Sequence, residues 1–169
     1  MSAVLKQIET PSPLAEKFKA LGIETVTWAH PPVFTVDEGL EFKHLIPGGH
    51  TKNLFLKDKK DQLWLLVALD NTVIDLKWLP KRIDAARLSF GNADLLLEVL
   101  GITPGSVTPF ALVNDVNRRV RPVLDARMLA CDVLNYHPLK NDKTTAIKPE
   151  DLLKFMRDLG YDPRIVDFE

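Results

Sequence analysis

PGGHTKNLFLKD, residues 47–58, joins a glycine turn to an apolar run, and the rest of the chain is organised around it. Adjacent glycines let the backbone approach a ligand closely because they lack Cβ, and the run Leu54–Leu56 is typical of a buried strand. Lys52 therefore lies where a loop meets a strand. A lysine in that position can hold a phosphate, a carboxylate or a polarised carbonyl, but a solvated lysine at a strand end has the same local pattern.

The segments around this stretch predict one α+β domain over residues 1–169. The apolar runs Asn53–Leu56 and Leu63–Leu69 flank the polar loop KDKKDQ, which predicts a hairpin at the centre of a sheet. Further strands are predicted over 24–28, 120–124, 132–136, 143–147 and 165–168, and helices over 12–21, 37–45, part of 71–83, 92–100 and 151–159. Strands outnumber helices and most successive strands look hairpin-connected. We therefore expect a single domain with a curved, mixed, mostly antiparallel sheet flanked by helices.

Composition narrows the class of protein. The 169 residues are 46% hydrophobic, enough for a real core, and 22 basic residues nearly balance 23 acidic ones. No global positive field would then drive non-specific binding to nucleic acid, so any RNA contact must be local. The single cysteine, Cys131, excludes an intramolecular disulfide. No segment has the length of a signal peptide core or a membrane span, so we expect a cytoplasmic protein with no membrane partner.

Several familiar kinds of catalytic site have no support in the sequence. The four histidines form no H-E-x-x-H pair and lack clustered carboxylates, so we expect no metal and no cofactor. Neither G-x-S-x-G nor G-x-x-x-x-G-K-[ST] occurs, and no covalent nucleophile stands out. Cys131 has the pattern of a buried structural cysteine. His137 precedes a proline at a strand end, which by itself favours a structural turn histidine.

Three loops, taken together and in order, carry a family resemblance. They are G-G-H-T-K-N at 48–53, G-S-V-T-P at 105–109 and H-P-L-K-N-D-K-T-T-A-I at 137–147. This combination resembles the YbaK/ProX family of aminoacyl-tRNA editing domains, the fold also found inserted in bacterial prolyl-tRNA synthetases. The resemblance spans residues 10–168. The sequence around H-T-K-N-L-F-L-K-D looks most like that of the free-standing deacylases that clear alanine from proline tRNA.

The resemblance implies a fold, a reaction and a set of site residues. It implies the editing-domain fold and trans-editing hydrolysis of the aminoacyl ester of mischarged tRNA, with Ala-tRNA(Pro) as substrate and prolyl-tRNA synthetase as a candidate protein partner. The lysine that matches Lys52 is the residue most tied to activity in that family. The matching substrate-binding positions are Asn53, Gly105, Ser106, Val107, Thr108, Pro109 and His137. Such an enzyme is needed because a proline site excludes alanine by only about 1–3 kcal/mol, so a second, smaller sieve must remove the error.

The tRNA body would need a basic surface. Lys81, Arg82 and Arg87 in PKRIDAAR form the one basic cluster without a matching acidic run, and we expect them to contact acceptor-stem phosphates; a solvated helix face has the same pattern. Three other functions stay open. They are a deacylase for another small amino acid, a non-catalytic nucleic-acid-binding regulator, and a binding module that uses Lys52 for an anionic ligand. The regulator would need a helix-turn-helix or a basic face, and neither is convincing here.

Overall fold

The predicted hairpin forms the centre of the sheet in the computed structural model of the chain, which describes residues 5–32 and 45–168. Strands β3 (Gly49–Asp58) and β4 (Leu63–Leu69) pair antiparallel from Thr51↔Leu69 to Lys57↔Leu63. All of β4 except its last residue is buried, as expected for a continuous apolar run that is covered on both faces. The hairpin prediction is confirmed, and β3 extends further in both directions than its apolar core suggested.

The sheet has nine strands in the described part of the chain. Seven strands besides the hairpin are β1 (Lys6–Ile8), β2 (Val26–Ala29), β5 (Leu88–Phe90), β6 (Val120–Asp125), β7 (Leu134–Tyr136), β8 (Lys143–Ile147) and β9 (Arg164–Val166). Their order is β1-β2-β8-β7-β3-β4-β6-β9, and β5 pairs with β3. Five of the strand pairings are antiparallel, and three are parallel, namely β3 with β7, β4 with β6, and β6 with β9. The mixed, mostly antiparallel α+β fold is therefore confirmed.

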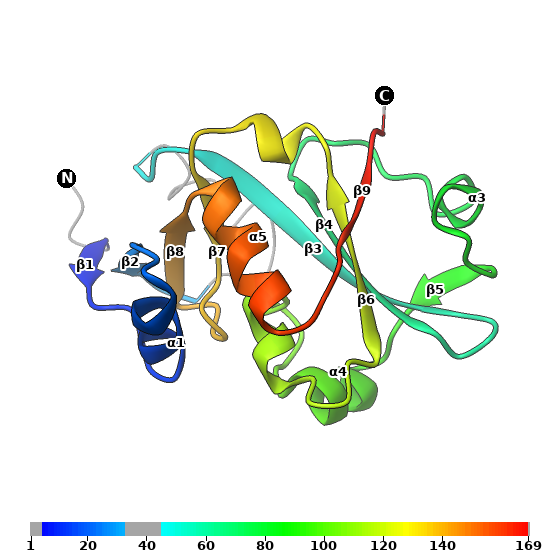
Figure 1. Cartoon of the computed structure of the whole chain (residues 1–169), viewed down its shortest axis with the longest axis horizontal. Coiled ribbons are helices and arrows are strands. Elements are labelled where there is room, and N and C mark those ends of the chain that lie inside the picture. The colour runs from blue at the N-terminus through cyan, green and yellow to red at the C-terminus, as the bar shows by residue number, and fades with distance from the viewer. Residues whose placement is uncertain (1–4, 33–44, 169) are drawn as a thin grey trace.

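Helices cover both faces of the sheet. The larger core joins one sheet face to α1 (Leu14–Leu21), α4 (Ala93–Leu100) and α5 (Pro149–Asp158), and also contains the 3₁₀ turn η1 (Pro109–Asn114). A smaller core on the opposite face packs around α3 (Leu79–Ile83). Figure 1 shows α1 and α3 at opposite ends of the molecule, with α5 between them. The centre of the sheet is thus buried on both sides, whereas the first half of β3 stays half-exposed.

Helices α1 and α4 end at the glycines that the sequence predicts. Gly22 and Gly101 end α1 and α4 in the left-handed conformation, with φ of 71° and 66°. Glycine accepts positive φ without the steric cost that a Cβ imposes. Asn92 caps α4 because its side chain accepts a hydrogen bond from the Leu95 amide at 2.8 Å. These local rules place both helices on the core without help from the tertiary structure.

Other predictions need correction. Only Leu79–Ile83 is helical within 71–83, because Pro80 lies in the first turn of α3, where no amide is needed, and so begins the helix instead of interrupting it. The strand predicted over 132–136 is shorter, β7, and follows a 3₁₀ turn at Met128–Ala130 (η2). Most successive strands are not hairpin-connected: in the described chain only β3–β4 and β7–β8 join antiparallel neighbours without an intervening helix. The helix predicted over 37–45 lies outside the described residues, apart from Leu45.

Candidate active site

Lys52 lies on β3 directly opposite Ala68 of β4. Ala68 is fully buried and small, so the lysine stem has room to lie across it. The Lys52 side chain is half-buried, and its Nζ donates a hydrogen bond to the backbone carbonyl of Thr72, just after β4. An ammonium group has three N–H donors, so this bond fixes its position and leaves two donors for other partners.

Thr72, whose carbonyl accepts from Lys52, also donates its hydroxyl to a buried carboxylate. Asp125, at the end of β6, is fully buried and accepts hydrogen bonds from the Leu69 amide at 3.2 Å, the Thr72 hydroxyl and the Arg127 amide at 3.0 Å. A carboxylate with several donors is a rigid anchor in a low-dielectric interior. The turn after β4, and through it the Lys52 ammonium, is therefore fixed from the neighbouring strand.

The glycine turn before Lys52 is fitted against β7. Gly48 has φ of 102°, and a Cβ there would lie 2.8 Å from the Val133 carbonyl oxygen, so no other residue fits. The Asn135 amide donates to the carbonyls of Pro47 at 3.0 Å and Gly49 at 3.2 Å. Asn135 was not predicted as a site residue. It fixes the entry to β3 from a strand that is far away in the sequence.

Asn53 lies on the opposite face of β3 from Lys52. It pairs with Val67, whose side chain belongs to the larger core. The Asn53 Oδ1 is buried and has no hydrogen-bond partner among the residues that the structure describes. A buried acceptor without a donor costs about 1–3 kcal/mol, so a bound donor would recover free energy here.

One edge of β3 is open at Lys52 and Asn53. The edge that faces away from β4 pairs with β7 at Gly49–His50 and with β5 at Leu56–Asp58. Between these pairings, residues 51–54 have no partner strand on that edge within 5–32 and 45–168. Unpaired backbone donors and acceptors at a strand edge readily bind an extended group. Lys52 and Asn53 therefore flank the same gap from its two sides.

His137 follows β7 at one end of this gap. It lies two residues beyond the pair His50↔Asn135, just as Lys52 does on β3, and β3 and β7 run in parallel. The His137 Nδ1 donates to the Lys143 carbonyl at 2.8 Å, which leaves Nε2 as an acceptor when the ring is neutral. Burial lowers the pKa of His137, and the nearby His30, whose ring centroid is 6.3 Å away, lowers it further. The neutral ring is thus the favoured form at pH 7.

The loop Gly105–Pro109 is rigid and lies on the Asn53 side of the sheet. Gly105 has φ of 90°, and the Ser106 amide bonds to the Thr103 carbonyl at 3.1 Å. Thr108 is fully buried and caps η1 by accepting from the Phe110 amide, while Val107 packs against the larger core. Within the described residues, no hydrogen bond or ion pair joins the loop to Lys52, Asn53 or His137. A shared pocket for all of them stays a prediction.

The predicted tRNA-binding cluster lies apart from this gap. Lys81 and Arg82 are exposed on α3, and Arg87 is exposed just before β5. The Arg82 guanidinium lies 5.0 Å from the ring centroid of Trp78, which in turn contacts Phe168. A cation stacked on an aromatic ring is held in place while its donors stay available. The cluster is thus an ordered basic surface; its contact with RNA stays a prediction.

Residues 5–32 and 45–168 contain no group of three or more His, Cys, Asp or Glu side chains that could hold a metal ion. Over the same residues, no helix has the length and apolarity needed to cross a bilayer.

Comparison with known proteins agrees with this arrangement. The model of the aminoacyl-tRNA editing domain family matches residues 30–155, which include all of the predicted site residues. The prolyl-tRNA synthetase associated domain-containing protein 1 of Danio rerio is 37% identical over 99% of this chain and 92% of its own length. The prolyl-tRNA editing protein ProX of Acetoanaerobium sticklandii is 34% identical over 85% of this chain and 88% of its own. A Schizosaccharomyces pombe protein provisionally named as a proline–tRNA ligase is 32% identical over 70% of this chain and 17% of its own.

Solved structures share the fold. A proposed trans-editing enzyme for prolyl-tRNA synthetase superposes with a TM-score of 0.69 at 18% identity, covering 94% of this chain and 98% of that one. A hypothetical protein superposes with a TM-score of 0.73 over 91% of this chain and 97% of that one. The family match, the relatives and the open edge of β3 beside its lysine lead to one assignment. The chain belongs to the aminoacyl-tRNA editing domain family.

Proposed function

We propose that this chain is a trans-editing deacylase that hydrolyses the aminoacyl ester of mischarged tRNA, with Ala-tRNA(Pro) as its substrate. The observation that carries the proposal is Lys52, which a buried network holds beside an unpaired strand edge in a chain of the editing family. Hydrolysis of an ester needs a polarised carbonyl, a placed water and donors for the developing oxyanion. Positioned charge and positioned backbone groups are what this gap offers.

In the proposed mechanism Lys52 supplies positive charge. One of its N–H groups donates a hydrogen bond to the Thr72 carbonyl. The other two donate to the ester carbonyl or to the phosphate of the terminal nucleotide. Backbone amides on the open edge of β3 and in the Gly105–Pro109 loop serve as further donors, and a ribose hydroxyl helps to orient the water. An ester is a reactive bond, so this arrangement does not require a covalent nucleophile.

Asn53 recognises the amino group of the substrate in this proposal. Its buried Oδ1 lacks a donor in the described chain, and the α-ammonium of an aminoacyl group is a charged donor that would satisfy it. Every amino acid carries this group, so the contact holds the ester in place but does not select alanine. Selection must come from the space around the side chain.

Size selection is assigned to two rigid walls. Alanine offers only a methyl group, which gives no polar feature to read, so proline must be rejected by steric conflict. The Gly105–Pro109 loop is fixed by Thr108 and the core, and His137 is fixed by its bond to Lys143. A pocket bounded by these walls would admit alanine and exclude the larger ring.

The partners follow from the same assignment. The family gives tRNA as the substrate, and Lys81, Arg82 and Arg87 are proposed to contact its acceptor stem. Prolyl-tRNA synthetase is proposed as a protein partner, since the relative from Schizosaccharomyces pombe carries a similar segment in a longer protein named as a proline–tRNA ligase. As in other editing systems, hydrolysis next to the synthetase would remove errors soon after they form.

One assay tests the proposal. Purified protein is incubated with a panel of aminoacyl-tRNAs that contains Ala-tRNA(Pro), Pro-tRNA(Pro), Ala-tRNA(Ala) and Ser-tRNA, and the loss of the ester is followed with time. Rapid deacylation of Ala-tRNA(Pro) with Pro-tRNA(Pro) spared is the expected result. Faster hydrolysis of another small aminoacyl group would change the substrate assignment. Absence of turnover with every aminoacyl-tRNA in the panel would contradict the deacylase proposal.

A further inference from the structure

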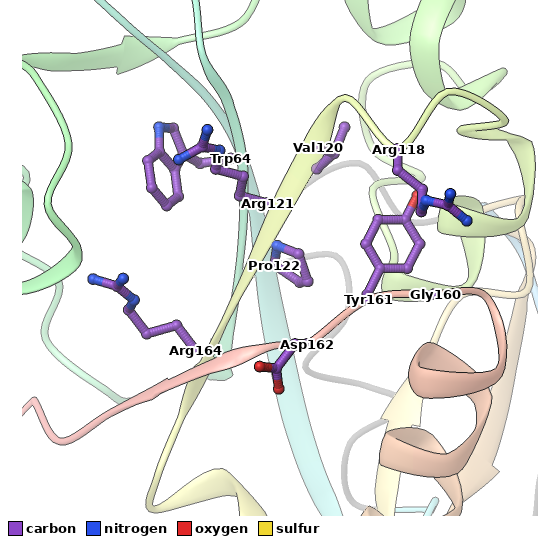
Figure 2. Close-up of a pocket in the computed structure, with 9 residues that line it drawn as sticks. All are labelled: Trp64, Arg118, Val120, Arg121, Pro122, Gly160, Tyr161, Asp162 and Arg164. Carbon is purple, nitrogen blue, oxygen red and sulfur yellow. The ribbon is translucent and has the colours of Figure 1, made fainter.

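A second basic site lies away from the β3 gap, at the start of β6. A cavity of about 310 Å³ is lined by Trp64, Arg118, Arg121, Tyr161, Asp162 and Arg164, among others. Figure 2 shows Arg121 beside Trp64, with Arg164 on the same side of β6, whereas Arg118 and Tyr161 lie on the other side. Three guanidinium groups and one carboxylate line this cavity, in a chain whose net charge is −1. The local excess of positive charge therefore needs its own explanation.

The cavity arginines have no acidic partner within residues 5–32 and 45–168, unlike four other surface cations. Lys17 pairs with Asp158, Lys57 with Asp61, Arg119 with Glu98 and Lys143 with Asp142. No ion pair joins Arg118, Arg121 or Arg164 to any carboxylate in the described chain. Asp115, the buried carboxylate three residues before Arg118, is occupied by the Arg119 and Val120 amides and the Tyr161 hydroxyl. The guanidinium donors are available to an anion from outside.

Arg121 is held in place for such a contact, and Arg164 lies beside it on the neighbouring strand. The Arg121 guanidinium lies 5.4 Å from the ring centroid of Trp64, and the Trp64 indole N–H donates to Asp58 at 3.2 Å. Arg164 pairs with Val123 on β6, two residues after Arg121, so both arginines are on the same face of the sheet. A guanidinium stacked on a fixed ring loses little conformational freedom when it binds a phosphate, and its planar fork suits two phosphate oxygens.

This site shares a sheet face with Lys52. Trp64 lies four residues from Ala68 on β4, and Ala68 is the partner of Lys52; Trp64 is also the partner of Arg121 on β6. At about 3.3 Å per residue and about 4.8 Å per strand, Arg121 is about 16 Å from Lys52 across the face. A stacked nucleic-acid strand advances about 3.4 Å per nucleotide, so the separation corresponds to about five nucleotides. Helix α3, which carries Lys81 and Arg82, packs on this same face.

We propose that Arg121 and Arg164, backed by Trp64, bind backbone phosphates of the acceptor arm about five nucleotides from the ester that Lys52 serves. The inference rests on the proposed deacylase function and adds to it a site outside the aminoacyl pocket. Phosphate contacts of this kind set position and affinity but not sequence, and each one adds to the salt dependence of binding. The site therefore acts on capture of the tRNA and leaves the chemical step unchanged.

The test compares Arg121→Ala and Arg164→Ala with Arg119→Ala. Arg119 is a neighbouring exposed arginine that is paired with Glu98, so its removal changes the net charge equally without opening the cavity. Binding of uncharged tRNA and deacylation of Ala-tRNA(Pro) are measured from low to high salt. For Arg121→Ala and Arg164→Ala we expect KM to rise about 3- to 10-fold, kcat to stay constant, and the slope of log K against log salt to fall by about one. Arg119→Ala should keep the wild-type slope.

The possible results separate failure of the phosphate site from failure of the proposed deacylase function. Variants at Arg121 and Arg164 that behave like Arg119→Ala, with melting temperatures equal to wild type, overturn the site even if the deacylase is active. If wild type neither binds nor deacylates tRNA, the proposed function fails, and the panel assay above identifies that failure separately. A parallel arm titrates inorganic phosphate and follows the melting temperature. Saturable stabilisation by phosphate that Arg121→Ala abolishes, with tRNA binding unchanged, would assign the cavity to a small anion and overturn the acceptor-arm proposal.

Discussion

At the scale of single residues, we expect Lys52 to matter more for the proposed chemistry than for folding. Its stem is half-buried over Ala68, and its ammonium bonds one carbonyl at the rim of the sheet. Removal of the side chain opens no cavity within the core and leaves no buried charge without a partner. By contrast, the Asp125 carboxylate is fully buried and bonds three separate groups, so it is part of the framework.

Lys52→Ala should therefore abolish deacylation with little change in stability. Loss of one preorganised donor to a developing oxyanion costs about 10²–10³ in rate, so kcat/KM for Ala-tRNA(Pro) should fall at least 10²-fold. Lys57→Ala is the matched control, because Lys57 is on the same strand and pairs only with Asp61. Initial rates and thermal melting of both variants are compared with wild type. Activity of Lys52→Ala within a few-fold of wild type would remove Lys52 from the mechanism.

His137 gives a pH dependence whose sign follows from burial. Its pKa in the folded protein lies below the ordinary value of 6.5, so below pH 6.5 the unfolded chain binds more protons than the folded one. Stability should fall as the pH drops below about 6.5 and level off under the folded pKa. Urea unfolding of wild type and His137→Gln between pH 5 and 7.5 measures this, since the variant cannot titrate. Equal pH slopes in the two proteins would show that His137 is not responsible.

Candidate site residues could be proposed from the sequence where they form a local motif, but not where their contacts join distant segments. The glycine turn, Lys52 and the Gly105–Pro109 loop could be recognised as short motifs. Thr72 is 20 positions from Lys52, and Asp125 is 53 positions from Thr72, and neither belongs to a recognisable motif. Their relation arises only when β6 pairs with β4 in parallel. A carboxylate at the end of an apolar strand was the one available sign of Asp125.

At the scale of elements, long periodic segments were predictable, and the shortest strands only in part. The hairpin of β3 and β4, helix α4 and helix α5 follow from apolar runs, caps and proline at a helix start. Of the four strands with three residues, β7 and β9 were predicted within longer segments, whereas β1 and β5 were missed. The open edge of β3 arises in the same way, as the interval between β7 and β5. The candidate site is therefore a product of topology, and the sequence predicts only the residues that flank it.

The turn after β4 should control the rate through Lys52. Thr72→Val keeps the carbonyl that binds Lys52 but removes the hydroxyl that bonds Asp125, at a cost of about 1–3 kcal/mol for the buried carboxylate. We expect lower stability, a lower kcat and little change in KM, because the loosened turn misplaces the ammonium. Thr72→Ser keeps the hydroxyl and should restore both quantities, and the exposed Thr103→Val should have neither effect. A stability loss without a change in kcat would limit Thr72 to a structural role.

At the scale of the whole molecule, the proposed tRNA path uses one face of the sheet and the proposed amino-acid pocket uses the other. Lys52, α3 and the Arg121 site share the face of the smaller core, whereas Asn53 and the Gly105–Pro109 loop lie on the face of the larger core. The gap in β3 joins the two faces. This arrangement separates capture of the tRNA from measurement of the aminoacyl side chain, so substitutions on the two faces should change different kinetic constants.

Selectivity should respond to the two proposed walls, the Gly105–Pro109 loop on the larger-core side and His137, which shares the register of Lys52. His137→Ala removes a ring that is fixed by Lys143, and Ser106→Gly loosens a buried loop position next to Gly105. Either change enlarges or softens the pocket, so hydrolysis of larger aminoacyl groups should rise relative to alanine even if total activity falls. The quantity to measure is the ratio of kcat/KM for alanyl-tRNA to that for 2-aminobutyryl-tRNA, with Arg121→Ala as a variant that alters capture alone. We expect the ratio to fall several-fold in the wall variants and to stay constant in Arg121→Ala; a ratio that is unchanged in both wall variants would place the size filter elsewhere.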